Sequence, residues 1–261
     1  MPDSTTPRTL DLNADVGESF GAWTMGDDAG LMRWVSSVNI ACGFHAGDPM
    51  VMRDTITLAL QHGVALGAHV SYPDLRGFGR HPQHLSPEQV QADCLYQIGA
   101  LTALAQALGA RLAHVKPHGA LYNQAARDRR LADAIAAAVH AADPSLRLVG
   151  LAGSELLAAG RACGLAVLAE GFVDRSYEAD GSLTPRQLPG AVYSDAARCS
   201  AQALAIARGE ALVSRDGTAV HVAADTLCLH GDRSDAAALA AAVHAALRGA
   251  GLVIGAPGPR A

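Results

Sequence analysis

The feature that most restricts the fold of this chain is a repeated alternation between short apolar runs and longer segments of helical periodicity. Runs rich in Val, Ile, Leu and Ala are typical of buried parallel strands, and the segments between them are typical of connecting helices. Seven runs are predicted as strands, at residues 9–15, 36–41, 65–70, 112–117, 146–152, 166–172 and 220–229. Helices are predicted near residues 48–62, 86–108, 128–142, 153–163, 194–208 and 234–248.

This pattern predicts an α/β fold of seven βα units, which either close into an incomplete TIM-like barrel or stay open as a doubly wound sheet. No linker-like composition interrupts the units, so residues 1–261 are predicted to form one domain. The segment 173–193 is rich in Pro, Gly and charge and is expected to be an ordered loop. Residues 211–222 are expected to form a hairpin with a type I′ turn at Asp216-Gly217.

The composition narrows the class of partner. A formal net charge of -5 provides no basic surface for phosphates, so neither nucleic acid nor a membrane is expected as a partner. The first ten residues lack the apolar stretch of a signal peptide, and a cytoplasmic protein is therefore expected. The five cysteines are widely spaced and form no C-x-x-C pair, which argues against both a disulfide framework and a structural zinc site. A small-molecule substrate or a protein partner is favoured.

Polar residues gather after six of the seven predicted strands. Because the carboxyl ends of parallel strands meet at one end of the fold, we expect these side chains to converge. In a chain with only 17% charged residues, this convergence indicates an enzyme. The residues are Asn13, Asp15, Glu18, Asn39, Cys42, His45, Asp48, His69, Asp74, Lys116, His118, Glu170, Asp174, Arg175, His230 and Asp232.

Lys116 is the only lysine, although the chain has 20 lysine and arginine residues in total. A lone ammonium indicates a site that needs a compact charge with an adjustable pKa. Asp15 is a candidate general base, whereas Asp11, on the same face of the strand, is either catalytic or a buried anchor. Cys42 is either a nucleophile beside an imidazole or, as the residue type favours, a small buried thiol.

Four histidines, His45, His69, His118 and His230, follow four different strands. They could gather around a metal ion or act as acid and base groups, and the sequence leaves both uses open. No P-loop, Rossmann G-x-G-x-x-G or G-x-S-x-G motif is present, and Lys116 is followed by Pro117. Any chemistry on ATP is therefore expected to involve another chain.

Six motifs of this sequence resemble the LamB/YcsF family. They are DLNADVGESFG (11–21), NIACGFHAGDP (39–49), GAHVSYPD with GFGR (67–80), VKPHGALYN (115–123), EGFVDRSY (170–177) and HGD (230–232). The resemblance implies a seven-stranded β/α barrel of the glycoside hydrolase/deacetylase type. It also implies ATP-coupled opening of the lactam 5-oxo-L-proline to L-glutamate, with 5-oxoprolinase subunits B and C as partners that help to handle the ATP.

On this basis, the expected catalytic residues are Asp15, His45, His69, Lys116 and His118. Asp15 would activate water, Lys116 would stabilise an oxyanion or a phosphorylated intermediate, and the histidines would shuttle protons. Arg175 is expected to hold the substrate carboxylate, because a planar guanidinium matches it. The full set expected to bind substrate is Asn13, Glu18, Asp48, Glu170, Arg175, His230 and Asp232.

Two other functions stay open. A metal-dependent amidohydrolase or deacetylase acting alone would use Asp15, His45 and His69 as ligands of a divalent metal. A non-catalytic subunit would only bind and present the substrate, and changes at Lys116 or Asp15 would then leave the assembled complex active.

Overall fold

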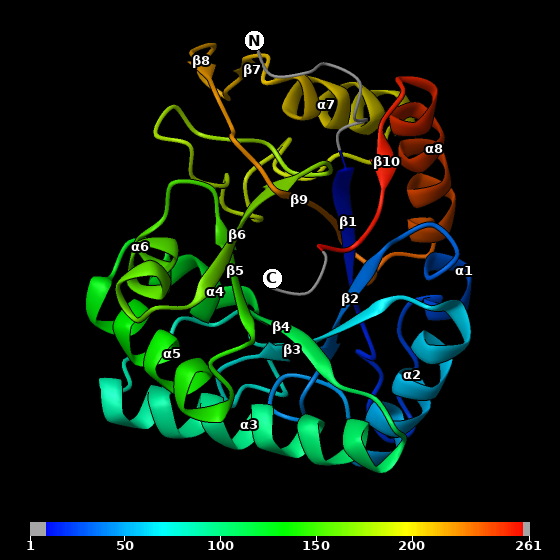
Figure 1. Ribbon diagram of the computed structural model, residues 1–261. Helices are drawn as coiled ribbons and strands as arrows, with labels where there is room; N and C mark the ends of the chain where they lie inside the picture. The colour runs from blue at the N-terminus through cyan, green and yellow to red at the C-terminus, as the bar shows by residue number, and fades with distance from the viewer. Residues whose placement is uncertain (1–8, 258–261) are drawn as a thin grey trace, which may run out of the picture.

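The computed structural model describes residues 9–257, in which seven parallel strands close into a barrel surrounded by helices (Figure 1). The barrel strands are β1 (Thr9–Val16), β2 (Ser37–Ala41), β3 (Ala65–Val70), β4 (Leu112–Pro117), β5 (Arg147–Leu151), β6 (Ala166–Phe172) and β9 (Thr226–Leu229). The strand β9 pairs with both β6 and β1, and this double pairing closes the barrel. The predicted α/β barrel is confirmed, and the open doubly wound sheet is excluded.

The helices lie outside the barrel (Figure 1). They are α1 (Asp28–Leu31), α2 (Pro49–His62), α3 (Pro87–Ala107), α4 (Gly119–Ala125), α5 (Arg129–Ala142), α6 (Glu155–Ala162), α7 (Ala196–Arg208) and α8 (Ala236–Gly249). Six of them match the predicted helices. The other two, α1 and α4, have four and seven residues and are too short for a periodic pattern to reveal.

The last predicted strand is wrong in its first half. The strand β8 (Ala219–Val220) pairs antiparallel with β7 (Leu212–Val213), and only Thr226–Leu229 enters the barrel. The predicted hairpin is therefore present, but its turn is not type I′, because Gly217 has a positive φ of 90° and Asp216 does not. The backbone carbonyl of Ser214 accepts from the Gly217 N–H at 3.0 Å, and the Ser214 N–H donates to Thr218 O at 2.9 Å, as in a three-residue hairpin loop.

The strand β1 shows how alternation along the sequence builds the barrel. Its even-numbered residues are apolar and belong to the hydrophobic core. Its odd-numbered residues Asp11, Asn13 and Asp15 are buried and form hydrogen bonds across the barrel interior. Since successive side chains of a strand point to opposite faces, a single strand supplies both the outer core and an inner polar layer. A short strand, β10 (Val253–Ile254), pairs with the first two residues of β1.

The segment 173–193 follows β6 and lies against the barrel as an ordered loop, as predicted. The Phe172 N–H donates to the Tyr177 hydroxyl at 2.7 Å, and Tyr177 is buried. Single bridges join Arg175 to Val192 and Tyr177 to Leu183. Within residues 9–257, no helix combines the length and the apolar character needed to cross a bilayer.

Candidate active site

A polar network fills the barrel, and Asp11 lies at its amino-terminal side. The Asp11 carboxylate accepts hydrogen bonds from Ser36, Ser37 and Thr226 at 2.6 to 2.9 Å. Ser37 and Thr226 are the first residues of β2 and β9. Of the two roles that the sequence left open for Asp11, these contacts support the buried anchor.

Lys116 lies at the centre of the next layer of the barrel. Its Nζ is 2.9 Å from both Asp15 Oδ1 and Glu170 Oε1, and 3.0 Å from Cys228 Sγ. Three such contacts match the three protons of an ammonium group. Burial opposes the charge, but the attraction of Asp15 and its neighbours raises the pKa of Lys116 well above its usual value. Lys116 is therefore a fixed buried charge engaged by the protein itself.

Asp15 is held in its charged form. Its Oδ1 also accepts from Asn39 Nδ2 at 2.9 Å, and its Oδ2 lies 3.3 Å from His69 Nε2. Burial opposes this charge, but the attraction of His69 and Lys116 holds the pKa of Asp15 well below its usual value. A carboxylate with so low a pKa is a weak base at neutral pH, which does not favour the expected role of Asp15 in activating water.

Four buried side chains gather next to Asp15, and we refer to Glu18, His45, His69 and His118 as the Glu/His cluster. Their potential ligand atoms all lie within 4.8 Å of one another. Carboxylate oxygens and imidazole nitrogens bind divalent metals such as zinc, so this cluster could hold a metal ion. Compared with the ligand set expected from the sequence, Glu18 takes the place of Asp15, and His118 is added.

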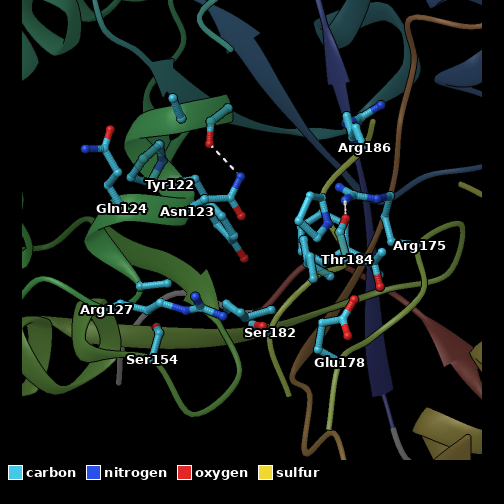
Figure 2. Close-up of a pocket in the computed structure, with 18 of the residues that line it drawn as sticks. Tyr122, Asn123, Gln124, Arg127, Ser154, Arg175, Glu178, Ser182, Thr184 and Arg186 are labelled. Atoms are coloured by element: carbon cyan, nitrogen blue, oxygen red, sulfur yellow. Dashed lines mark hydrogen bonds between the residues drawn. The ribbon is translucent and has the colours of Figure 1, made fainter. Parts of the chain in front are cut away.

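A cavity of about 970 Å³ opens at the carboxyl ends of the strands. Asp15, His69, Lys116, His118 and His230 contribute to its lining, and the cavity therefore reaches both the buried lysine and the Glu/His cluster. Its outer part lies between α4 and the segment that follows β6. Figure 2 shows these two walls, one with Tyr122, Asn123 and Gln124 and the other with Arg175, Thr184 and Arg186.

His230 is oriented by Asp174 in the cavity wall. Its Nδ1 lies 2.8 and 3.0 Å from the two Asp174 oxygens, so Nδ1 carries the proton that it donates to the carboxylate. In the neutral ring, Nε2 then carries the lone pair. Burial lowers the pKa of His230 despite the attraction of Asp174, which keeps the ring neutral near pH 7.

Five arginines line the same cavity, namely Arg80, Arg127, Arg175, Arg186 and Arg215, but they differ in what they bind. Arg175 donates to Ala191 O at 3.2 Å and to Thr184 O at 2.5 Å, so its guanidinium secures the loop. Arg80 forms an ion pair with Asp232 at 2.5 Å. The Arg186 side chain forms neither a hydrogen bond nor an ion pair with any other residue in 9–257, and its burial and the Arg80 charge lower its pKa. Arg127 pairs with Asp180 at 3.1 Å, and Arg215 is exposed, so Arg186 is the partly buried arginine that is available to an anion.

The barrel does not bring every expected residue to the cavity. Asp48 caps α2, where its carboxylate accepts from the N–H groups of Gly21, Met50 and Val51. Asn13 and Glu170 are joined by a hydrogen bond of 3.0 Å inside the barrel and belong to the Lys116 network. These contacts place the three residues in supporting positions instead of at the cavity wall.

Cys42 is a buried thiol that lies 3.1 Å from Ile40 O. Burial raises the pKa of Cys42 to about 12, which disfavours the thiolate needed for nucleophilic attack.

Sequence reasoning missed Arg186, because this residue lies in the loop between Pro185 and Gln187, where no periodic pattern marks it.

Comparison with known proteins places the chain in a family. Residues 10–259 match the model of the LamB/YcsF family. This chain belongs to the LamB/YcsF family. The six motifs described above had predicted this membership, which is confirmed over almost the whole chain.

Relatives of this LamB/YcsF chain match it over almost its whole length. The A subunit of 5-oxoprolinase from Methylococcus capsulatus is 56% identical over 251 residues, which make up 96% of each chain. The corresponding 5-oxoprolinase protein of Geobacillus kaustophilus is 55% identical and covers 96% of this chain and 97% of its own length. The crystal structure of a lactam utilization protein from Thermus thermophilus is similar with a TM-score of 0.90 and 48% identity, and the match covers 95% of this chain and 100% of that protein.

Proposed function

We propose that this chain is the subunit of an ATP-dependent 5-oxoprolinase that hydrolyses the lactam bond of 5-oxo-L-proline to give L-glutamate. The observation that carries the proposal is the identity of 55 to 56%, over at least 96% of both chains, to proteins named as the A subunit of 5-oxoprolinase. The cavity geometry supports it, since a basic nitrogen and a free guanidinium line the same space. These two groups match the amide and the carboxylate of the substrate.

His230 is the proposed general base of the reaction. With Nδ1 donating to Asp174, Nε2 can accept a proton from water while the water oxygen bonds to the lactam carbonyl carbon. The carbon–nitrogen bond then breaks, and the same proton passes from His230 to the leaving nitrogen. Asp174 is a positioning residue in this scheme, because it fixes the tautomer of the ring.

Arg186 is the proposed partner of the substrate carboxylate. A partly buried guanidinium that has no side-chain partner within residues 9–257 gains most from a bidentate anion, because its hydrogen-bonding edges are available. This assignment replaces Arg175, whose donors are directed at Ala191 and Thr184. Phe172 lines the cavity and packs against His230 with ring centroids 5.6 Å apart, and it supplies an apolar surface for the lactam ring.

Lys116 and Asp15 are proposed to act through the electrostatics of the site. The ammonium bridges two carboxylates from β1 and β6, so it holds the two strands and their charges in a fixed arrangement beneath the cavity. Fixed charges in a buried site stabilise a developing charge without reorganising during the reaction. Lys116 thus contributes as a preorganised charge at the cavity floor.

Partner subunits B and C are proposed to supply the ATP chemistry, which activates the lactam carbonyl before water attacks it on this chain. This chain has neither of the glycine-rich motifs that cradle phosphates, and its lysine is engaged by carboxylates. The test is to measure L-glutamate and ADP formation from 5-oxoproline and ATP, for this chain alone and together with the two candidate partners. We expect both products only from the complete set. Substrate-stimulated ATP hydrolysis by the isolated chain would contradict this division of labour, and no L-glutamate from the complete set would contradict the function.

A metal-dependent amidohydrolase acting alone is the second candidate function, and the Glu/His cluster is the observation that favours it. This function requires lactam or amide hydrolysis by the isolated chain without ATP. Chelator-sensitive hydrolysis under those conditions would favour it over the ATP-dependent reaction.

A further inference from the structure

The tautomers of two histidines in the Glu/His cluster are set by backbone carbonyl groups. His69 Nδ1 lies 2.9 Å from Lys116 O, and His118 Nε2 lies 2.9 Å from Phe78 O. A carbonyl oxygen only accepts hydrogen bonds, so each of these ring nitrogens must carry a proton. When each ring is neutral, the other nitrogen, Nε2 of His69 or Nδ1 of His118, carries a lone pair, whereas a charged His69 donates from Nε2 towards Asp15.

These two lone-pair nitrogens face each other at 2.9 Å. Two acceptors at that distance repel each other unless a positive group lies between them or beside them. Histidines that bind metals almost always donate their second N–H to a carbonyl or carboxylate, and both His69 and His118 do so here. The hydrogen-bond pattern is that of two ligands prepared for a cation.

The side chains of the other two members of the cluster form no hydrogen bond within residues 9–257. Both ring nitrogens of His45 are buried and have no hydrogen-bond partner in the described part of the chain, and the residue is only 1% exposed. Glu18 Oε1 lies 3.6 Å from His45 Nε2 and 3.7 Å from His118 Nδ1, too far for a good hydrogen bond. A buried polar group without a partner is costly, and one bound cation would engage one ligand atom from each of the four side chains.

We propose that Glu18, His45, His69 and His118 bind one divalent transition-metal ion of the zinc type. Three imidazole nitrogens and one carboxylate oxygen suit zinc or cobalt better than magnesium or calcium, which prefer all-oxygen sites. This inference concerns binding and does not depend on the substrate. In the proposed function, such an ion beside the cavity would polarise the lactam carbonyl.

Asp15 is not among the proposed ligands, although it lies next to the cluster. Its Oδ1 is engaged by Lys116 and Asn39. Its Oδ2 lies 3.3 Å from His69 Nε2, which is the nitrogen that His69 offers to the ion. Asp15 therefore borders the site and contributes negative charge to it.

The loop that carries Phe78 is built tightly around the cluster. Phe78 has a φ of 55°, an uncommon conformation for a bulky residue, and its ring packs edge-on against the rings of His45 and His118. A Cβ on Gly79 would lie 2.8 Å from His118 and 2.9 Å from His45, so only glycine fits there. The loop thus keeps both rings in position, as a preorganised metal site requires.

The test is direct measurement of metal binding to the full chain. The protein is stripped with a chelator and titrated with Zn²⁺ by calorimetry and with Co²⁺ by visible absorption, and metal content is measured by elemental analysis. We expect one ion per chain, and we expect H45A to weaken Co²⁺ affinity by more than about 100-fold, since even residues behind the ligands contribute about 10- to 100-fold. E18Q serves as a second variant because it keeps the side-chain volume.

H114Q is the matched control, because His114 is a buried barrel histidine whose Nε2 is already paired with Asn39 at 2.7 Å. It should keep wild-type affinity for Co²⁺. Failure of the wild-type chain to take up either ion would overturn the proposal and indicate that His69 and His118 share a proton. Wild-type affinity in both H45A and E18Q, or equal weakening in H114Q, would also overturn it. None of these results depends on 5-oxoproline turnover, so the proposed function is tested separately.

Discussion

His230 and Asp174 form a pair in which Nδ1 of the ring lies 2.8 Å from the carboxylate and Nε2 is left as the basic nitrogen of the cavity wall. The two residues come from different strands, since Asp174 follows β6 and His230 follows β9. Because β6 and β9 are adjacent in the barrel, the closing pairing of the sheet is what brings the base to its orienting carboxylate.

We expect D174N to lower 5-oxoproline turnover by about 100-fold or more, because an amide in place of the carboxylate no longer favours the tautomer with a free Nε2. The measurement is L-glutamate formation by the complex with its partners. D133N is the control, since Asp133 is exposed on α5, and it should keep wild-type turnover. Near wild-type turnover in D174N would remove His230 from the role of base.

Replacement of Arg186 tests the carboxylate contact. We expect R186Q to raise KM for 5-oxoproline by about 10- to 100-fold with a smaller change in kcat, which corresponds to the loss of a charge-assisted hydrogen bond. R186K should recover part of this loss. Arg53 is exposed on α2, so R53Q is the matched control and should leave KM unchanged. An unchanged KM in R186Q would mean that Arg186 does not bind the substrate carboxylate, and Arg175 or Arg80 would then be the candidate for this role.

The buried charge of Lys116 has a consequence for stability. K116M leaves the carboxylates of Asp15 and Glu170 buried without their cation, and we expect it to lower the free energy of unfolding by about 3 to 5 kcal/mol. Urea denaturation at neutral pH measures the change, with R53M as the surface control. A K116M chain as stable as the wild type would show that the two carboxylates do not depend on the ammonium.

The lowered pKa of the buried His114 side chain predicts that the stability of the protein depends on pH. Burial, followed by the Lys116 charge, lowers the pKa of His114 to about 3. In the unfolded chain its pKa is about 6.5, so between these two values only the unfolded state binds the proton. The contribution of His114 to the free energy of unfolding therefore falls on acidification, by about 1.4 kcal/mol per pH unit.

The variant H114Q isolates this effect. Between about pH 6 and pH 5, we expect its stability to depend on pH less steeply than that of the wild type, by the equivalent of about one proton. Urea denaturation at several pH values measures the slope, and H140Q, at an exposed position of α5, should leave it unchanged. Identical slopes for H114Q and the wild type would mean that His114 titrates normally in the fold.

Limited proteolysis tests the proposal that the whole chain is one domain. The residues from Gln187 to Gly190 are exposed, so we expect trypsin to cut first after Arg186 and the nicked protein to stay associated. Size-exclusion chromatography and mass spectrometry of the products measure this outcome. A stable fragment released by cleavage between Arg127 and Arg130, near the middle of the chain, would contradict a single domain.

The amino-acid sequence was enough to predict the βα units, the family and most of the residues that meet at the carboxyl end of the barrel. These properties depend on local periodicity and on alternation along each strand, as in β1, where Asp11 and Asp15 share the inner face. The short elements α1, α4 and β10 could not be predicted in this way, because a few residues carry too little pattern.

The tertiary structure alone decides which atoms of those residues can bind a ligand or take part in the reaction. Lys116 meets Asp15 and Glu170, residues from three separate strands, and these contacts turn an expected free donor into a fixed charge. Arg186 is the partly buried cavity arginine without a side-chain partner within residues 9–257, whereas Arg175 is engaged by loop carbonyls. The physical reason is that a pKa, a tautomer or a free hydrogen-bonding edge depends on partners distant in sequence, which barrel closure and loop packing select.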